Sequence, residues 1–173
     1  MMITLNPRLT PLEIKSFLGG DLYYGSKIKP EQCEIFRQKI NDYLPKLDLN
    51  QNEDYLVANA LNPLLQSLGF TTAIKHKSQG RSEIDLIITQ ENNQKNNVAV
   101  IFEAKKPKNP EMIRLDNPNT TALHEAILYY LRERERAFSQ RARFELKYII
   151  ITDFYEFFFF DESEFERVFY NDE

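Results

Sequence analysis

Two short apolar runs joined by a polar stretch constrain the fold of this chain more than any other feature. Residues 82–89 (SEIDLIIT) and 97–104 (NVAVIFEA) are rich in the aliphatic residues that favour strands. The polar run between them, residues 91–97, is full of residues that tolerate the dihedral angles of a turn. The pattern predicts a β-hairpin whose second strand, apolar on both faces, is central in its sheet.

Three charged residues interrupt this apolar setting: Asp85 in the first run, then Glu103 and Lys105 at the end of the second. Side chains alternate along a strand, so Glu103 and Lys105 share a face, and an antiparallel hairpin can bring Asp85 beside them. Charges in apolar strands are costly unless they are paired or bound to a metal, and a divalent cation relieves the repulsion between two carboxylates. Oxygen ligands beside an ammonium suit Mg²⁺-assisted phosphodiester hydrolysis. The simpler alternative is an ordinary ion pair at a solvated strand end.

The pattern Asp85, then Glu103-Ala104-Lys105, resembles the PD-(D/E)xK nuclease superfamily, with Ile84 where the superfamily's name has proline. The resemblance implies a metal-dependent DNA-cleaving centre. In such a centre Asp85, Glu103 and the Ala104 carbonyl bind Mg²⁺, for which Mn²⁺ can substitute. Lys105 then acts on the attacking water.

Composition indicates a soluble α/β or α+β protein of one domain, since the 173 residues are 42% apolar and 28% charged. No apolar run approaches the roughly 20 residues that span a membrane, and the N-terminus lacks a signal-peptide pattern, so we expect a cytoplasmic protein. The lone cysteine, Cys33, excludes an internal disulfide and is expected to be a packed thiol rather than a nucleophile. With two histidines besides, a structural zinc site is not expected.

The formal net charge of −4 is unevenly spread, which matters for nucleic-acid binding. Residues 153–173 hold a charge of −7, so the remainder of the chain carries +3. Such local basic patches can contact phosphates whatever the total charge. The residues predicted to contact DNA flank the charged site: Lys77, Arg81, Lys106 and Lys108. Solvated surface lysines are the alternative for any one of them.

The rest of the chain alternates between helical and strand patterns. Pro63 is expected to kink or restart the third helix. The charges of residues 132–136 are expected on a solvated face, with ion pairs within the helix. Helices are predicted at residues 10–18, from Pro30 to about Leu44, at 53–68, from 119–121 to 136, and at 164–170. Phe36 is assigned to the apolar stripe of the second helix, and Phe165, Val168 and Phe169 to one side of the last. Further strands are predicted at residues 70–77, 146–152 and 154–161, the last as an edge strand apolar enough to be covered on both faces.

Two polar residues near predicted helix starts are candidates for the site. Glu53 follows the expected cap Asn52 and leans toward the core side of its helix, although a first-turn acid can also serve the helix dipole alone. His124 could touch a phosphate, but a structural histidine is favoured. The superfamily often has an acid at such a helix start that touches the metal site, so the resemblance makes Glu53 a catalytic candidate.

The order of segments extends the resemblance. The stretches GRSEIDLII, FEAKKPKNPEMI, TALHEAILYYLRERE and KYIIITDFYEFFFFD together are similar to the N-terminal nuclease domain of type IIG restriction–modification enzymes. A glutamine that supports the site in some superfamily members has no counterpart in the body of the helix after the hairpin. The resemblance implies a restriction-endonuclease-like mixed central β-sheet flanked by helices, of α/β (α+β) class, with an N-terminal helical extension (1–50) and a nuclease core (51–173).

The same resemblance implies function and partners. It predicts a Mg²⁺-dependent DNA endonuclease acting on double-stranded DNA, with a methyltransferase and a target-recognition region in the same polypeptide or complex. The chain is accordingly expected to be part of a longer protein. Two alternatives stay open: a non-catalytic DNA-binding module on the same fold, and a nuclease that resembles Holliday-junction resolvases.

Overall fold

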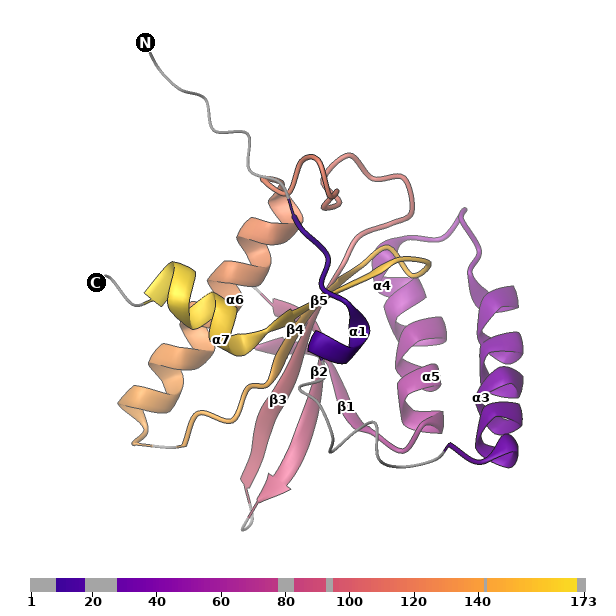
Figure 1. Cartoon of the computed structure of the whole chain (residues 1–173), viewed down its shortest axis with the longest axis horizontal. Coiled ribbons are helices and arrows are strands. Elements are labelled where there is room, and N and C mark those ends of the chain that lie inside the picture. Colours follow the sequence, from indigo (N-terminus) through magenta and orange to yellow (C-terminus); the bar gives the residue numbers. More distant parts are fainter. Residues whose placement is uncertain (1–8, 18–27, 78–82, 93–94, 142, 171–173) are drawn as a thin grey trace.

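A five-stranded mixed sheet forms the centre of the molecule (Figure 1). The computed structural model describes residues 9–17, 28–77, 83–92, 95–141 and 143–170. Strands β1 (Thr71–Lys77), β2 (Glu83–Asn92) and β3 (Lys95–Ala104) pair antiparallel in sequence order. Strand β4 (Tyr148–Thr152) pairs parallel with β3, and β5 (Phe157–Asp161) antiparallel with β4. A parallel pair needs a long crossover, and helix α6 (Thr121–Ser139) supplies it.

Helices cover both faces of the sheet and divide the core in two. Figure 1 shows α6 on one side and helices α3 and α5 on the other. The α6 side buries residues that alternate along the strands with those of the opposite side, as one expects of a sheet packed on both faces. The α6-side core includes Ile87, Ile101, Ala126, Tyr130 and Ile149. The opposite core includes Leu56, Leu61, Leu86, Phe102 and Ile150. The predicted fold class is therefore confirmed.

One interrupted helix leads into β1. It consists of α4 (Glu53–Leu56), a π-helical turn η2 (Val57–Leu61) and α5 (Asn62–Ser67). The side chain of Asn52 accepts a hydrogen bond from the Tyr55 N–H and caps α4, as predicted. Pro63 has no N–H to donate and its ring crowds the carbonyl one turn earlier, so the wider π turn before it relieves that clash. The expected interruption at Pro63 is thus present.

The N-terminal helices differ in how well the sequence predicted them. Helix α3 (Pro30–Tyr43) has the expected bounds, and a 3-10 turn at Leu44–Lys46 follows it. Helix α1 is a single turn (Ile14–Phe17), so the predicted start at residues 10–11 is wrong, and the predicted end at residue 18 lies outside the described residues. The Phe17 ring packs on Tyr148 of β4 and holds this turn against the sheet.

Helix α3 is an outer layer with one buried end. Its only fully buried residue is Tyr43, whose hydroxyl donates to the carbonyl of Phe154 at 2.7 Å. The expectation of a packed Cys33 is wrong: the thiol is exposed, because α3 contacts the body through its C-terminal end. Phe36, assigned to the apolar stripe of this helix, is exposed for the same reason.

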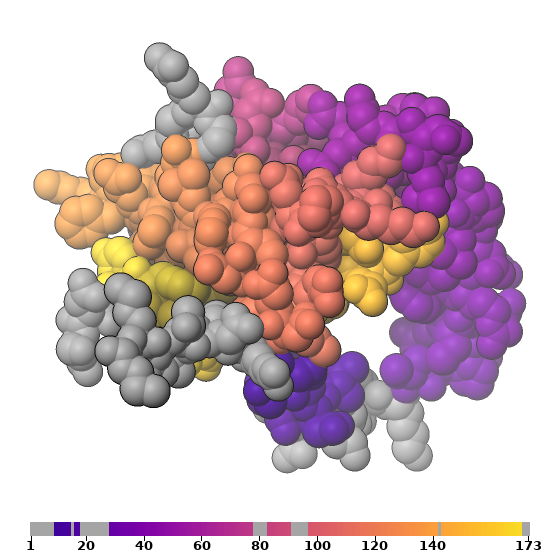
Figure 2. Space-filling view, turned by 90° about the horizontal axis from the view of Figure 1, so that it is seen from above, coloured from indigo at the N-terminus to yellow at the C-terminus, as the bar shows by residue number. Residues whose placement is uncertain are grey.

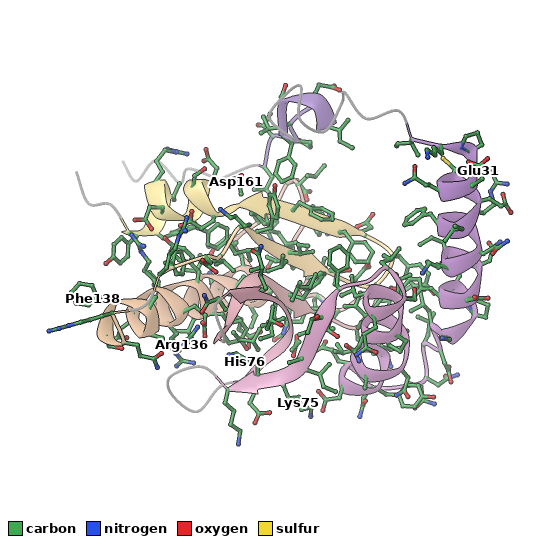
Figure 3. All side chains as sticks on the ribbon, turned by 90° about the horizontal axis from the view of Figure 1, so that it is seen from below. Glu31, Lys75, His76, Arg136, Phe138 and Asp161 are labelled. Atoms are coloured by element: carbon green, nitrogen blue, oxygen red, sulfur yellow. The ribbon has the colours of Figure 1, made fainter. Side chains whose placement is uncertain are left out.

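The far end of α6 also differs from expectation, because its charges are not all solvated. Glu133 is only 2% exposed and pairs with Arg136 at 2.7 Å. The predicted pairing within the helix is present, but β1 adds His76 at 3.7 Å from the same carboxylate. Figure 3 shows His76 and Arg136 side by side, where β1 passes α6. Packing of α6 against the sheet thus buries a carboxylate that the sequence pattern assigned to a solvated face.

The last two strands are shorter than predicted, and the last helix begins two residues earlier than predicted. Residues 154–156 form a turn, not strand, since the Asp153 N–H bonds to the Glu156 carbonyl. Strand β5 is an edge strand but is not covered on both faces, because Phe159 stays exposed. Helix α7 (Glu162–Phe165) continues as a π-helical turn η3 (Glu166–Tyr170), in which Val168 and Phe169 are exposed rather than buried with Phe165.

Candidate active site

The predicted site lies where β2 and β3 stop pairing. The last regular pair is Leu86 with Phe102, and one step further in this register Asp85 reaches the level of Glu103. The pairing of β1 with β2 also skips Asp85 and the residue opposite it, Lys75. The φ of Lys75 is 50°. The Asp85 Oδ2 atom instead accepts the Ala104 N–H at 2.8 Å. The carboxylate therefore occupies a local opening of the sheet at the carboxyl end of β3.

Glu103 and Lys105 share the α6-facing side of β3, as predicted. The Glu103 side chain is 1% exposed and that of Lys105 is 9% exposed. Lys105 Nζ lies 2.6 Å from Glu103 Oε1 and 2.6 Å from Oε2 of Glu125 on α6. The Lys105 N–H bonds to the Thr152 carbonyl at 2.9 Å, which fixes this segment beside β4. The ammonium is thus held between strand and helix.

Glu53 reaches the same edge of the sheet from the start of α4. Its Oε2 accepts the backbone N–H of Lys106 at 2.7 Å. Asp85 accepts the N–H of Ala104, two residues before Lys106, so both carboxylates are held at the same strand end. The structure therefore brings Glu53 together with Asp85, Glu103 and Lys105. Its neighbour Asp54 points elsewhere and pairs with Lys75 at 2.6 Å.

Burial perturbs both strand carboxylates in the same direction. Burial raises the pKa of Asp85 to about 6, with the Ala104 N–H opposing the shift and the charge of Glu53 adding to it. Burial also raises the pKa of Glu103 well above its usual value, and the charge of Asp85 raises it further. These carboxyl groups are costly to ionise as long as no cation compensates them.

The ammonium of Lys105 behaves differently. Burial would lower its pKa, but the charge of Glu103 and hydrogen bonds to Glu103 and Glu125 outweigh that effect, so its pKa is raised and the group stays charged. Burial raises the pKa of Glu53 as well, although Lys105 acts against the shift. Around one ammonium the site thus gathers four acidic groups, an excess that favours a cation.

The predicted ligands, two carboxylates and a carbonyl, are of the chemical kind that Mg²⁺ takes. Among the described residues, Glu103 Oε2 is buried and finds no hydrogen-bond donor, although a buried polar atom normally has a partner. A hydrogen bond with the Glu125 carboxyl also raises the pKa of Glu103. Within the described ranges, no three Asp, Glu, His or Cys side chains converge closely enough to hold an ion by themselves. The predicted ligand set has two carboxylates and the Ala104 carbonyl, and Mg²⁺ usually keeps several waters beside one or two carboxylates.

The residues predicted to contact DNA differ in how near the site they lie in the chain and in how exposed they are. Lys106 follows the site directly and is partly exposed, and Lys108 is exposed with φ of 66°. Lys77, at the end of β1, is mostly exposed and lies 3.6 Å from Glu83. Arg81 lies outside the described residues. Figure 2 shows the segment after β3 at the surface, between α6 and the layer of α3.

His124 is exposed, and its Nε2 lies 2.7 Å from Asn119 Oδ1 at the start of α6. This contact with a nearby side chain agrees with the favoured structural role of His124.

Sequence reasoning missed two residues of α6 that face the site. Glu125 pairs with Lys105, and Tyr129, one turn later, donates its hydroxyl to the Glu83 carbonyl at 2.9 Å. Burial, and next the charge of Glu103, raise the pKa of Tyr129. The available signal was position: Glu125 directly precedes Ala126, which lies on the buried face of α6.

The chain folds into a mixed β-sheet flanked by helices, and this architecture is consistent with a nuclease-like α/β fold. The chain belongs to the family described as a domain of unknown function, DUF7149, which matches residues 13–173. No curated protein and no solved structure matches the chain. In the part of the chain that the structure describes, no helix has the length and apolar character needed to cross a bilayer.

Proposed function

We propose that this chain is a Mg²⁺-dependent DNA endonuclease domain. The observation that carries the proposal is the Glu103 carboxyl, buried at a strand end beside Lys105 and level with Asp85, with one oxygen for which the described residues supply no donor. An ordinary ion pair does not require a second carboxylate in the same buried site, nor an oxygen without a partner. The arrangement supports the assignment to the PD-(D/E)xK superfamily.

Each residue of the site has a role in this proposal. Asp85 and Glu103, with the Ala104 carbonyl, hold Mg²⁺, which supplies Lewis-acid assistance when it is bound. Lys105 orients the attacking water, helps to take its proton and stabilises the negative charge that develops on the phosphate. Glu53 is placed to hold a second ion or an ordered water.

DNA binding depends on the residues around the site rather than within it. Lys106 and Lys108, with Lys77 and Arg81, contact backbone phosphates, and such contacts carry no sequence information. We propose that the chain is the restriction-nuclease part of a type IIG restriction–modification enzyme in the cytoplasm. Sequence choice then resides in the target-recognition region that accompanies a methyltransferase, so this chain alone cuts weakly and without specificity.

A plasmid-nicking assay in Mg²⁺ or Mn²⁺ tests the proposal. The expected result is nicking by the wild type and a loss of roughly 100-fold or more in Asp85→Ala and Lys105→Ala, typical for loss of a group that stabilises transition-state charge. The matched controls are Asp42→Ala and Lys46→Ala, which alter exposed residues outside the site and should leave nicking unchanged. Equal nicking by all five proteins would reject the assigned site.

The same proteins separate the two alternatives. A non-catalytic DNA-binding module binds DNA after loss of Glu103 and needs no metal, so calorimetric titration with Mn²⁺ shows no uptake at the cluster. A nuclease that resembles junction resolvases prefers branched over linear DNA in the same assay. The proposal predicts Mn²⁺ uptake and no preference for branched DNA.

A further inference from the structure

The single ammonium of the site has two carboxylate partners. Lys105 Nζ is 2.6 Å from an oxygen of Glu103 and 2.6 Å from an oxygen of Glu125. These are its ion-pair partners among the described residues. The two differ in setting, because the Glu103 side chain is 1% exposed and that of Glu125 is 37% exposed. The ammonium thus lies between a buried partner on β3 and an outer partner on α6.

This arrangement creates a conflict when a divalent cation enters. The cation and Lys105 require the same Glu103 carboxylate, and two positive charges this close repel each other. Lys105 is only 9% exposed, so an ammonium that loses Glu103 without a replacement would be a buried unpaired charge, which is costly. The ammonium therefore needs a partner that does not bind the cation.

We propose that Glu125 is a positioning residue that retains Lys105 when a divalent cation takes over Glu103. The inference rests on the proposed function, because it presumes cation binding by Asp85 and Glu103. Lys105 then shifts from a contact shared by two carboxylates to a contact with Glu125 alone. This keeps its ammonium next to the reacting phosphate and off the carboxylate that the cation occupies.

The position of Glu125 on α6 suits this role. The next residue, Ala126, is fully buried, and Tyr129 anchors the helix to β2 through its hydroxyl bond to Glu83. The helix therefore fixes the Glu125 backbone relative to the sheet. The carboxylate itself is partly solvated, so it carries its negative charge at lower cost than a buried group.

A double-mutant cycle on cation affinity tests the proposal without measuring cleavage. Mn²⁺ affinity is determined by calorimetry for the wild type, Glu125→Ala, Lys105→Met and the double variant. The expected result is that Glu125→Ala weakens Mn²⁺ binding about tenfold when Lys105 is present, a coupling of common size for contacting residues. In the Lys105→Met background the same change should alter affinity by less than about threefold, the residual direct effect of one partly solvated charge.

Two further variants keep the test specific. Glu125→Gln retains an acceptor for the Lys105 ammonium and should lose clearly less affinity than Glu125→Ala. Glu135→Ala, which alters an exposed acid on the same helix, should bind Mn²⁺ like the wild type. Circular dichroism confirms that every variant is folded.

The remaining outcomes contradict the inference in distinguishable ways. Equal weakening by Glu125→Ala in both backgrounds would make Glu125 a direct cation ligand rather than a partner of Lys105. Unchanged or tighter binding in Glu125→Ala would show that Lys105 needs no second carboxylate. A wild type that binds no Mn²⁺ would overturn the proposed function as well.

Discussion

Replacing Asp85 by asparagine should make the metal-free protein more stable at neutral pH. Burial raises the pKa of Asp85 from an ordinary 3.8 to about 6. Ionising it in the folded state therefore costs about 3 kcal/mol, since each pKa unit corresponds to roughly 1.4 kcal/mol. Asparagine has nothing to ionise, and its side-chain oxygen can still accept the Ala104 N–H.

The sign of the pH dependence follows from the raised folded-state pKa. The contribution of Asp85 to stability is fully present below pH 3.8 and is lost as the pH rises through about 6. The free energy of unfolding of Asp85→Asn minus that of the wild type should thus increase by about 3 kcal/mol from below pH 4 to above pH 7. Taking this difference cancels the titration of the shared groups that do not interact with Asp85; the pKa of Glu103 is instead lower in the variant, because the charge of Asp85 is gone.

The assay is urea unfolding followed by circular dichroism in EDTA at unit pH steps. Saturating Mg²⁺ should then stabilise the wild type, since a ligand that binds only the folded state adds stability, and should stabilise Asp85→Asn far less. A stability difference that stays flat from pH 4 to pH 8 would refute the reasoning, because Asp85 would then ionise as easily as in the unfolded chain.

Three further predictions concern the fold and the DNA interface. Tyr43→Phe should cost about 1 kcal/mol of unfolding free energy in urea, since it leaves the buried Phe154 carbonyl without its donor. Glu133→Ala should cost about 2 kcal/mol in the same assay, because it breaks a buried pair with the partly exposed Arg136. Lys108→Ala should weaken DNA binding and reduce the slope of log affinity against log salt by about 1 for one lost phosphate contact. An unchanged salt slope would remove Lys108 from the interface.

Local sequence patterns predicted the parts of the fold that depend on alternation and capping. The hairpin of β2 and β3 follows from two aliphatic runs, and the start of α4 from the Asn52 cap. The placement of Glu103 and Lys105 on one face follows from strand periodicity alone. Asp85 joined them because the hairpin is antiparallel, which the polar run between the strands already indicated.

The patterns failed where a residue's environment depends on packing between distant segments. An amphipathic pattern cannot tell which turns of an outer helix reach the body, so Cys33 was misplaced. Glu133 is buried because β1 passes beside α6, a contact between residues far apart in sequence. Glu125 escaped notice for the same reason, since its role emerges only where α6 crosses the end of β3.

The central claim is that Asp85 and Glu103 share a divalent cation. The most direct test is a crystal structure of the protein grown with Mn²⁺, with diffraction measured at the manganese absorption edge. The account predicts an anomalous peak within coordination distance of carboxylate oxygens of both residues, and its loss in Asp85→Asn. A well-ordered site without such a peak, or a peak that contacts neither carboxylate, would contradict it.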